Sequence, residues 1–152
     1  MLDIYALAAE YISACQETSV LKKRIIRMNQ INETANAEAV LPVGLATAER
    51  AVNEIVSRWK RSLLKLELVI CRYELAASML TNRERVVLKL HYEQGITLRN
   101  IAKMDLSAYG IDSVSVSTLS RTCKLISEKF TLQMQVLNKD NEAEVIWLKE
   151  NE

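Results

Sequence analysis

The chain has 152 residues, 49% of them hydrophobic and 26% charged, with only three glycines and one proline. A composition this apolar excludes a wholly disordered chain, and the length allows one domain or two small ones. The scarcity of helix-breaking residues favours an all-α protein. The net charge of +1 is unevenly distributed along the chain. Residues 81–130 carry eight basic and five acidic side chains, whereas the tail, residues 131–152, carries two basic and five acidic ones. A basic stretch of this kind is compatible with a polyanionic partner.

The sequence contains few residues that could form a catalytic or metal site. Cys15, Cys71 and Cys123 are far apart and form no Cys-x-x-Cys pair, and His91 is the only histidine. Buried, reduced thiols and no metal are therefore expected. Neither a catalytic triad nor a glycine-rich phosphate loop can be built, so we expect neither an enzyme nor a cofactor. The chain shows no signal pattern and no apolar run of about 18 residues, which predicts a cytoplasmic protein without a membrane partner.

Two stretches within residues 1–80 show the alternating three- and four-residue spacing of a coiled-coil seam. In the first stretch only Thr18 is polar, and in the second every position is apolar. The seams comprise Ile4, Leu7, Tyr11, Ala14, Thr18, Leu21, Ile25 and Met28, and then Val52, Val56, Trp59, Leu63, Leu66, Ile70, Tyr73, Ala77 and Leu80. The second helix, from about Thr47 to Leu80, is expected to be roughly 50 Å long at 1.5 Å per residue.

A connector at about residues 33–46 separates these two helices. It contains Pro42 and Gly44, residue types that stop helices, and its shortness predicts that the helices fold back as an antiparallel hairpin. The hairpin is interpreted either as a plain scaffold or as an arm for dimerisation or docking, because Leu64 and Val69 beside the seam supply further apolar surface. Pairing within the chain and a homodimer are both compatible with the pattern.

Residues 81–103 carry the start signals of two more helices. Thr81 and Glu84 fit a capping box, in which side chain and backbone groups bond reciprocally. Gly95 suits the left-handed position just past a helix end, and Thr97 fits a second N-cap. The residues expected to face inward are Val87, Leu90, Tyr92, Leu98, Ile101 and Ala102.

A third helix is expected from Ser115, its cap, to Phe130. One stripe of this helix is apolar and the opposite side is polar and basic. The stripe comprises Leu119, Cys123, Ile126 and Phe130, and the polar side comprises Ser117, Ser120, Arg121 and Lys124. Residues 81–130 therefore predict a tri-helical helix-turn-helix, whose last helix offers a short basic half to the major groove of DNA. The tail, residues 131–152, contains the apolar cluster 145–148, which either folds back or binds a partner.

These residues carry a resemblance to known proteins. The stretch from Leu80 to Ala102 resembles the start of sigma factor region four, and the stretch from Val114 to Arg121 is similar to the start of its recognition helix. The matching positions of the first stretch are Leu80, Arg83, Glu84, Val87, Leu88, Leu90, Tyr92, Gly95, Thr97, Leu98, Ile101 and Ala102. Together with the preceding hairpin, the pattern resembles small phage regulators of the ArpU/RinA type, which implies activation of late phage genes.

The sequence departs from the sigma pattern at two places. Asn100 stands where a glutamate is usual, so the second capping box is incomplete. The segment between Ala102 and Val114 is about seven residues longer than the tight turn of a helix-turn-helix, and Gly110 is expected there in a loop or a small added helix.

We therefore expect an all-α protein with three parts: a hairpin arm at 1–80, a sigma-like helix-turn-helix at 81–130 and a tail at 131–152. The expected function is sequence-specific binding of double-stranded DNA in transcription control, with RNA polymerase and a second copy of the chain as further candidate partners. The expected DNA-binding residues are Thr97, Arg99, Lys103, Ser117, Thr118, Ser120, Arg121 and Lys124. The alternatives are a DNA-packaging recognition subunit and a protein-interaction adaptor or inhibitor whose helix-turn-helix does not bind DNA.

Overall fold

A computed structural model describes residues 2–38 and 42–150, and the side chains of residues 2–34 and 49–137. The predicted all-α fold is confirmed, since every regular element of the described chain is helical. The elements are α1 (Ile4–Glu38), α2 (Pro42–Ser78), α3 (Asn82–Val87), the π-helix η1 (Leu88–Glu93), α4 (Leu98–Lys103), the 3-10 helix η2 (Ser107–Tyr109) and α5 (Val116–Glu150).

The chain packs as two compact units whose borders fall inside the two long helices. Tyr11–Ile70 forms the hairpin unit, and Met1–Glu10 with Cys71–Glu152 forms the helix-turn-helix unit. The first residues of α1 and the last residues of α2 thus belong to the second unit, although the sequence places a border at residue 80. Helix α5 continues without a break past residue 130, the expected start of a separate tail.

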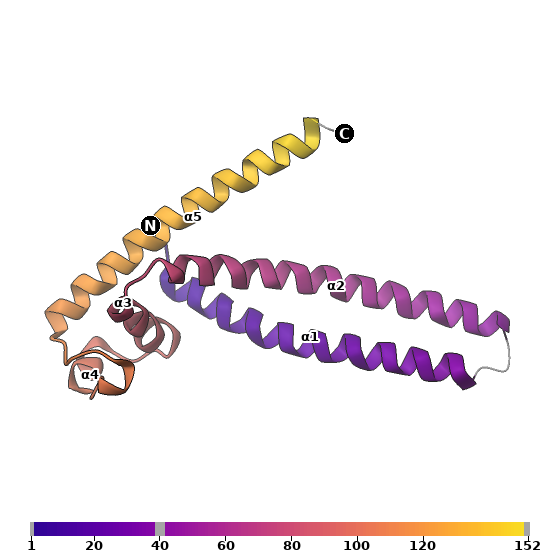
Figure 1. Ribbon diagram of the computed structural model, residues 1–152, viewed down its shortest axis with the longest axis horizontal. Helices are drawn as coiled ribbons and strands as arrows, with labels where there is room; N and C mark the ends of the chain where they lie inside the picture. Colours follow the sequence, from indigo (N-terminus) through magenta and orange to yellow (C-terminus); the bar gives the residue numbers. More distant parts are fainter. Residues whose placement is uncertain (1, 39–41, 151–152) are drawn as a thin grey trace. The chain divides into compact units, whose positions relative to one another are not determined.

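In the hairpin unit, α1 and α2 run antiparallel and side by side (Figure 1). The predicted seam is confirmed in both helices, because all of its members in the described side chains are buried or half-buried. Ala14 and Ile25 of α1 and Val56 of α2 are the most buried apolar members in this unit. An ion pair between Lys22 Nζ and Glu67 Oε1, 3.5 Å long, links the two helices at the surface. Beside the seam, Leu64 is exposed and Val69 is half-buried.

The connector is shorter than the sequence suggested. Helix α1 extends to Glu38, α2 begins at Pro42, and residues 39–41 lie outside the described residues. A proline at the first helical position loses no hydrogen bond, because that N–H has no partner within the helix. The interpretation of Pro42 and Gly44 as helix-stopping residues was therefore wrong, since both lie in the first turn of α2.

One position of the α1 seam is occupied by a polar residue. The hydroxyl of Thr18 is buried without a hydrogen-bond partner among the described residues. We expect Thr18→Val to raise the free energy of unfolding by about 1–2 kcal/mol, because valine keeps the shape and removes the desolvated hydroxyl. Urea denaturation followed by circular dichroism measures the change.

The matched control for Thr18→Val is Thr34→Val on the same helix. The Thr34 hydroxyl is exposed and donates to the Gln30 carbonyl at 3.0 Å. This control should bring no gain, and an equal gain from both variants would mean that the effect comes from helix propensity and not from the buried hydroxyl.

The start and stop signals of the helix-turn-helix unit are confirmed. The Thr81 hydroxyl accepts a hydrogen bond from the Glu84 N–H at 3.4 Å, and the Glu84 carboxylate accepts one from the Thr81 N–H at 3.5 Å. Gly95 has φ +73°, the left-handed conformation that a residue without Cβ adopts readily. The Thr97 hydroxyl accepts from the Asn100 N–H at 3.3 Å and starts α4.

The first helix of this unit changes type along its length, which the sequence did not reveal. After Val87 the α-helix becomes the π-helix η1, and its end is closed by the hydrogen bond from the Ile96 N–H to the Leu90 carbonyl at 2.9 Å. Val87 and Leu90 are buried, as predicted, and Tyr92 is half-buried. Helix α4 packs against both η1 and α5, and α3 packs against α5.

The long segment between α4 and α5 is anchored to the body of the unit. Leu106 is 1% exposed, and the 3-10 helix η2 begins just after it and is capped by Gly110, which has φ +75°. The Asn82 side-chain amide donates to the Tyr109 carbonyl at 3.3 Å and fastens the segment to the start of α3. A buried leucine and a small added helix thus replace the tight turn of shorter helix-turn-helix units.

The end of α2 is held by contacts to two other elements. The Tyr73 hydroxyl donates to Glu93 Oε2 at 2.9 Å. The Tyr73 ring meets the Phe130 ring of α5 edge to face, with centroids 5.5 Å apart. The last turns of α2 therefore belong to the helix-turn-helix core.

Candidate nucleic-acid interface

The first turns of α5 present the predicted polar face to solvent. Leu119, Ile126 and Phe130 are fully buried on the opposite side. Ser117, Arg121 and Lys124 follow each other in steps of four and three residues and are all exposed. Such steps place side chains on one side of a helix. With Ser120, which is also exposed, two cations and two hydroxyl groups therefore share one solvent-facing surface, which we name the α5 polar face (Ser117, Ser120, Arg121 and Lys124).

The hydroxyl groups at the start of α5 take part in hydrogen bonds with one another and with the backbone. Ser115 Oγ accepts from the Thr118 N–H at 3.3 Å, which confirms the predicted cap. It also lies 3.1 Å from Ser117 Oγ and 3.0 Å from Thr118 Oγ1. Each hydroxyl oxygen has two lone pairs, so these contacts leave acceptor capacity. Thr118 is half-buried and belongs to the cap more than to the α5 polar face.

Helix α4 contributes two of the predicted cations. Arg99 and Lys103 are four residues apart and exposed, so they lie on one side of this short helix. Thr97, the third predicted contact of α4, is exposed, but its hydroxyl already caps the helix. Since α4 packs on α5, the unit carries exposed cations on both of the helices that a helix-turn-helix uses.

An acidic side chain also belongs to this part of the unit. The Asp105 carboxylate accepts a hydrogen bond from the Ser107 N–H at 3.0 Å. That bond, with a further one from the Ser107 side chain, lowers the pKa of Asp105. This carboxylate stays charged and fixes the start of η2, where it would repel a phosphate that came close.

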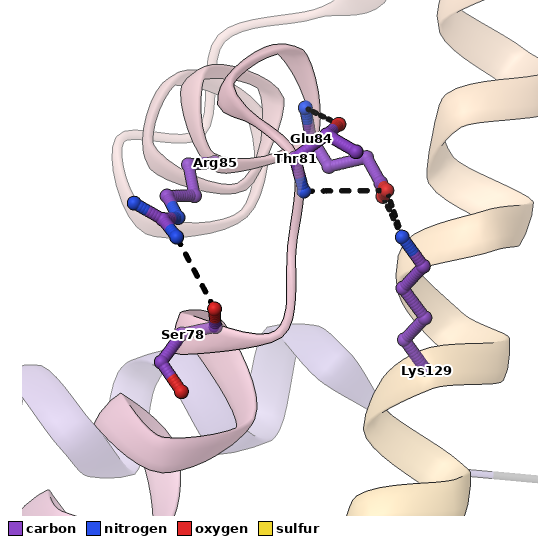
Figure 2. Close-up of polar contacts among 5 residues, drawn as sticks. All are labelled: Ser78, Thr81, Glu84, Arg85 and Lys129. Atoms are coloured by element: carbon purple, nitrogen blue, oxygen red, sulfur yellow. Dashed lines mark hydrogen bonds and ion pairs between the residues drawn. The ribbon is translucent and has the colours of Figure 1, made fainter.

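One contact that the sequence did not reveal is an ion pair between a buried carboxylate and a half-buried ammonium group. Glu84 is 3% exposed, and Lys129 Nζ lies 2.5 Å from its Oε1 and 2.8 Å from its Oε2 (Figure 2). The capping box gave Glu84 a local role, but the partner lies 45 residues further along the chain. Glu84 therefore joins the start of α3 to the middle of α5.

Arg85 also has a structural contact that the sequence did not reveal. Its guanidinium donates to the Ser78 carbonyl at 3.1 Å, at the end of α2 (Figure 2). A cation that bonds a C-terminal carbonyl complements the negative end of the helix dipole. Although Arg85 is exposed, this hydrogen bond makes it a cap of α2.

The single histidine is held by two contacts. His91 Nδ1 lies 2.8 Å from the Ile96 carbonyl, which can only accept, so this nitrogen carries the proton. In the neutral ring Nε2 then accepts from the Tyr5 hydroxyl, 2.5 Å away. The Tyr5 ring also packs on Tyr92, with centroids 4.7 Å apart. His91 thus fastens the start of α1 to η1.

The three cysteines are free thiols. Burial raises the pKa of the Cys123 thiol, so it stays protonated and is a poor nucleophile. Burial, together with the neighbouring Cys123, also raises the pKa of Tyr92. Cys15 and Cys123 are half-buried and Cys71 is exposed. The prediction that all three are buried was wrong, because Cys71 lies beside the α2 seam and not on it.

The described part of the chain contains no group of three or more histidine, cysteine, aspartate or glutamate side chains arranged to hold a metal ion. Within the same residues, no helix combines the length and the apolar composition that a membrane-spanning segment requires. Comparisons of the chain with protein-family models, with curated proteins and with solved structures gave no match.

Proposed function

We propose that this protein binds double-stranded DNA in a sequence-specific manner and regulates transcription. The observation that carries the proposal is the α5 polar face, in which Ser117, Arg121 and Lys124 are exposed at the start of a helix that packs on α4. In a helix-turn-helix, the first turns of the last helix contact base edges in the major groove. The resemblance to sigma region four and to phage regulators supports a role in transcription, with RNA polymerase as a candidate partner.

The two cations of the α5 polar face are proposed to act differently. Arg121 lies one turn after Ser117, and its planar fork can donate two hydrogen bonds to a guanine edge, a contact worth about 1–3 kcal/mol of base discrimination. Lys124 lies further along the helix and is proposed to contact phosphate, which adds affinity without sequence information. No described residue forms an ion pair with either side chain, so both charges are available.

The test compares Arg121→Ala and Lys124→Ala on the DNA site that the protein prefers and on random duplex. Arg121→Ala should weaken the preferred site far more than random DNA. Lys124→Ala should weaken both alike and lower the salt slope of binding by roughly one unit. Fluorescence anisotropy at several salt concentrations measures both effects.

Circular dichroism is the control for folding in this test. If both variants bind DNA like the parent chain while remaining folded, the α5 polar face is not a DNA surface. In that case the unit acts through proteins, as an adaptor or inhibitor.

A further inference from the structure

The hairpin unit is basic as a whole, whereas the unit that contains the helix-turn-helix is acidic. Residues 11–70 carry nine basic and six acidic side chains, whereas the other unit carries eleven basic and thirteen acidic ones. The net charges are therefore +3 and −2. A polyanion would be attracted to the hairpin at least as strongly as to the rest of the chain.

Four of these cations form a stripe on α2. Arg50, Arg58, Arg61 and Lys65 are separated by eight, three and four residues, which at 3.6 residues per turn places all four on one side of the helix, within about 80° around its axis. All four are exposed. The stripe spans about 22 Å at 1.5 Å per residue. The seam residues of α2 lie on the opposite side of the helix, so the stripe faces away from α1. We name it the α2 basic stripe.

The stripe borders a shallow hollow of about 380 Å³. Its lining is entirely polar or charged and comprises Arg50, Asn53, Glu54, Ser57, Arg58 and Arg61. Glu54 is the only acid among them, and none of the three arginines forms an ion pair with a described residue. Arg61 Nε donates to the Ser57 carbonyl at 3.5 Å, which leaves its two terminal nitrogens available for a ligand.

We propose that the α2 basic stripe binds phosphates of the backbone of double-stranded DNA, as a second contact besides the helix-turn-helix. This inference rests on the proposed function. A guanidinium can donate two parallel hydrogen bonds to a phosphate, and three exposed arginines in a row match a regular chain of anions. Each DNA strand carries a phosphate about every 3.4 Å along the axis, so a stripe of this length can reach several phosphates. The contact adds affinity but no sequence preference.

The test uses the full chain and the triple variant Arg50→Gln/Arg58→Gln/Arg61→Gln. The matched control is Lys23→Gln/Arg24→Gln/Arg27→Gln, which removes the same charge from exposed positions of α1. The α2 variant should lower the salt slope of binding to random duplex by roughly two to three units, since each lost phosphate contact contributes about 0.9. It should weaken preferred and random DNA by the same factor, whereas the α1 control should change the slope by less than roughly one unit.

Several results would overturn this inference without touching the proposed function. One is a folded α2 variant whose salt slope equals that of the parent chain, while Arg121→Ala still abolishes the preference for the site. Another is an equal loss in the α1 control, which would mean that net charge alone acts. Equal competition by single-stranded RNA of the same length would reassign the stripe to another polyanion. A parent chain that binds no duplex even at low salt would refute the proposed function itself.

Discussion

Phe130→Ala is expected to lower the free energy of unfolding by about 3–5 kcal/mol, the largest loss we predict for a single substitution. Phe130 is 0% exposed and its ring packs edge to face on Tyr73. The truncation removes a large apolar side chain from the place where α5 meets the end of α2, and a cavity remains. Urea denaturation followed by circular dichroism measures the loss.

Two further variants of α5 make this prediction specific. Phe130→Leu keeps most of the apolar volume and should cost less than about 1.5 kcal/mol. Leu132→Ala removes a side chain that is 67% exposed, and its effect should stay within about 0.5 kcal/mol. If Phe130→Ala and Leu132→Ala destabilised the protein equally, the packing of α5 on the helix-turn-helix core would be wrong.

Lys129→Met is expected to lower the free energy of unfolding by about 2–3 kcal/mol. The substitution leaves the Glu84 carboxylate buried without its cation, and among the described residues only the Thr81 N–H, 3.5 Å away, still donates to it. The side chain of Glu84 is 4% exposed and that of Lys129 is 37% exposed. Because water reaches the ammonium group and screens it in part, the loss should be smaller than for a fully buried pair.

A double-mutant cycle isolates this interaction. Lys129→Met in a Glu84→Gln background should cost at least about 1 kcal/mol less than in the parent, because no buried charge is left behind. Lys124→Met, at an exposed position of the same helix, is the control and should have little effect. Strictly additive losses would show that the Glu84–Lys129 pair contributes nothing to stability.

Local signals made much of the fold predictable. The seam of α1 and α2 follows from a spacing that repeats within each helix, and burial confirms it. The capping box at Thr81, the left-handed Gly95 and the caps Thr97 and Ser115 each depend on residues only a few positions apart. Backbone geometry at a helix end is decided by such neighbours, so a single sequence is enough.

Contacts between distant residues were the part that the sequence did not reveal. The partner of Glu84 is Lys129, and the partner of Tyr5 is His91, 86 residues away. A lysine or tyrosine looks the same in sequence whether it is solvated or paired, so only the fold identifies these pairs. The same holds for Leu106, whose burial turns a long irregular segment into a fixed connection.

The candidate site was predictable in part. The exposed positions of Arg121 and Lys124 follow from their place opposite the apolar stripe of α5. The mutual contacts of the Ser115, Ser117 and Thr118 hydroxyls were not foreseen, because they depend on rotamers at the start of the helix. The α2 basic stripe is visible in the sequence as a spacing, but its exposure and the hollow beside it become evident only in the fold.

Selection of bound fragments from a pool of random double-stranded DNA tests the central claim most directly. The full chain should enrich one defined sequence motif over successive rounds, and Arg121→Ala should lose the enrichment at one or more positions of that motif. A folded parent chain that enriches no motif, even at low salt, would contradict sequence-specific DNA binding.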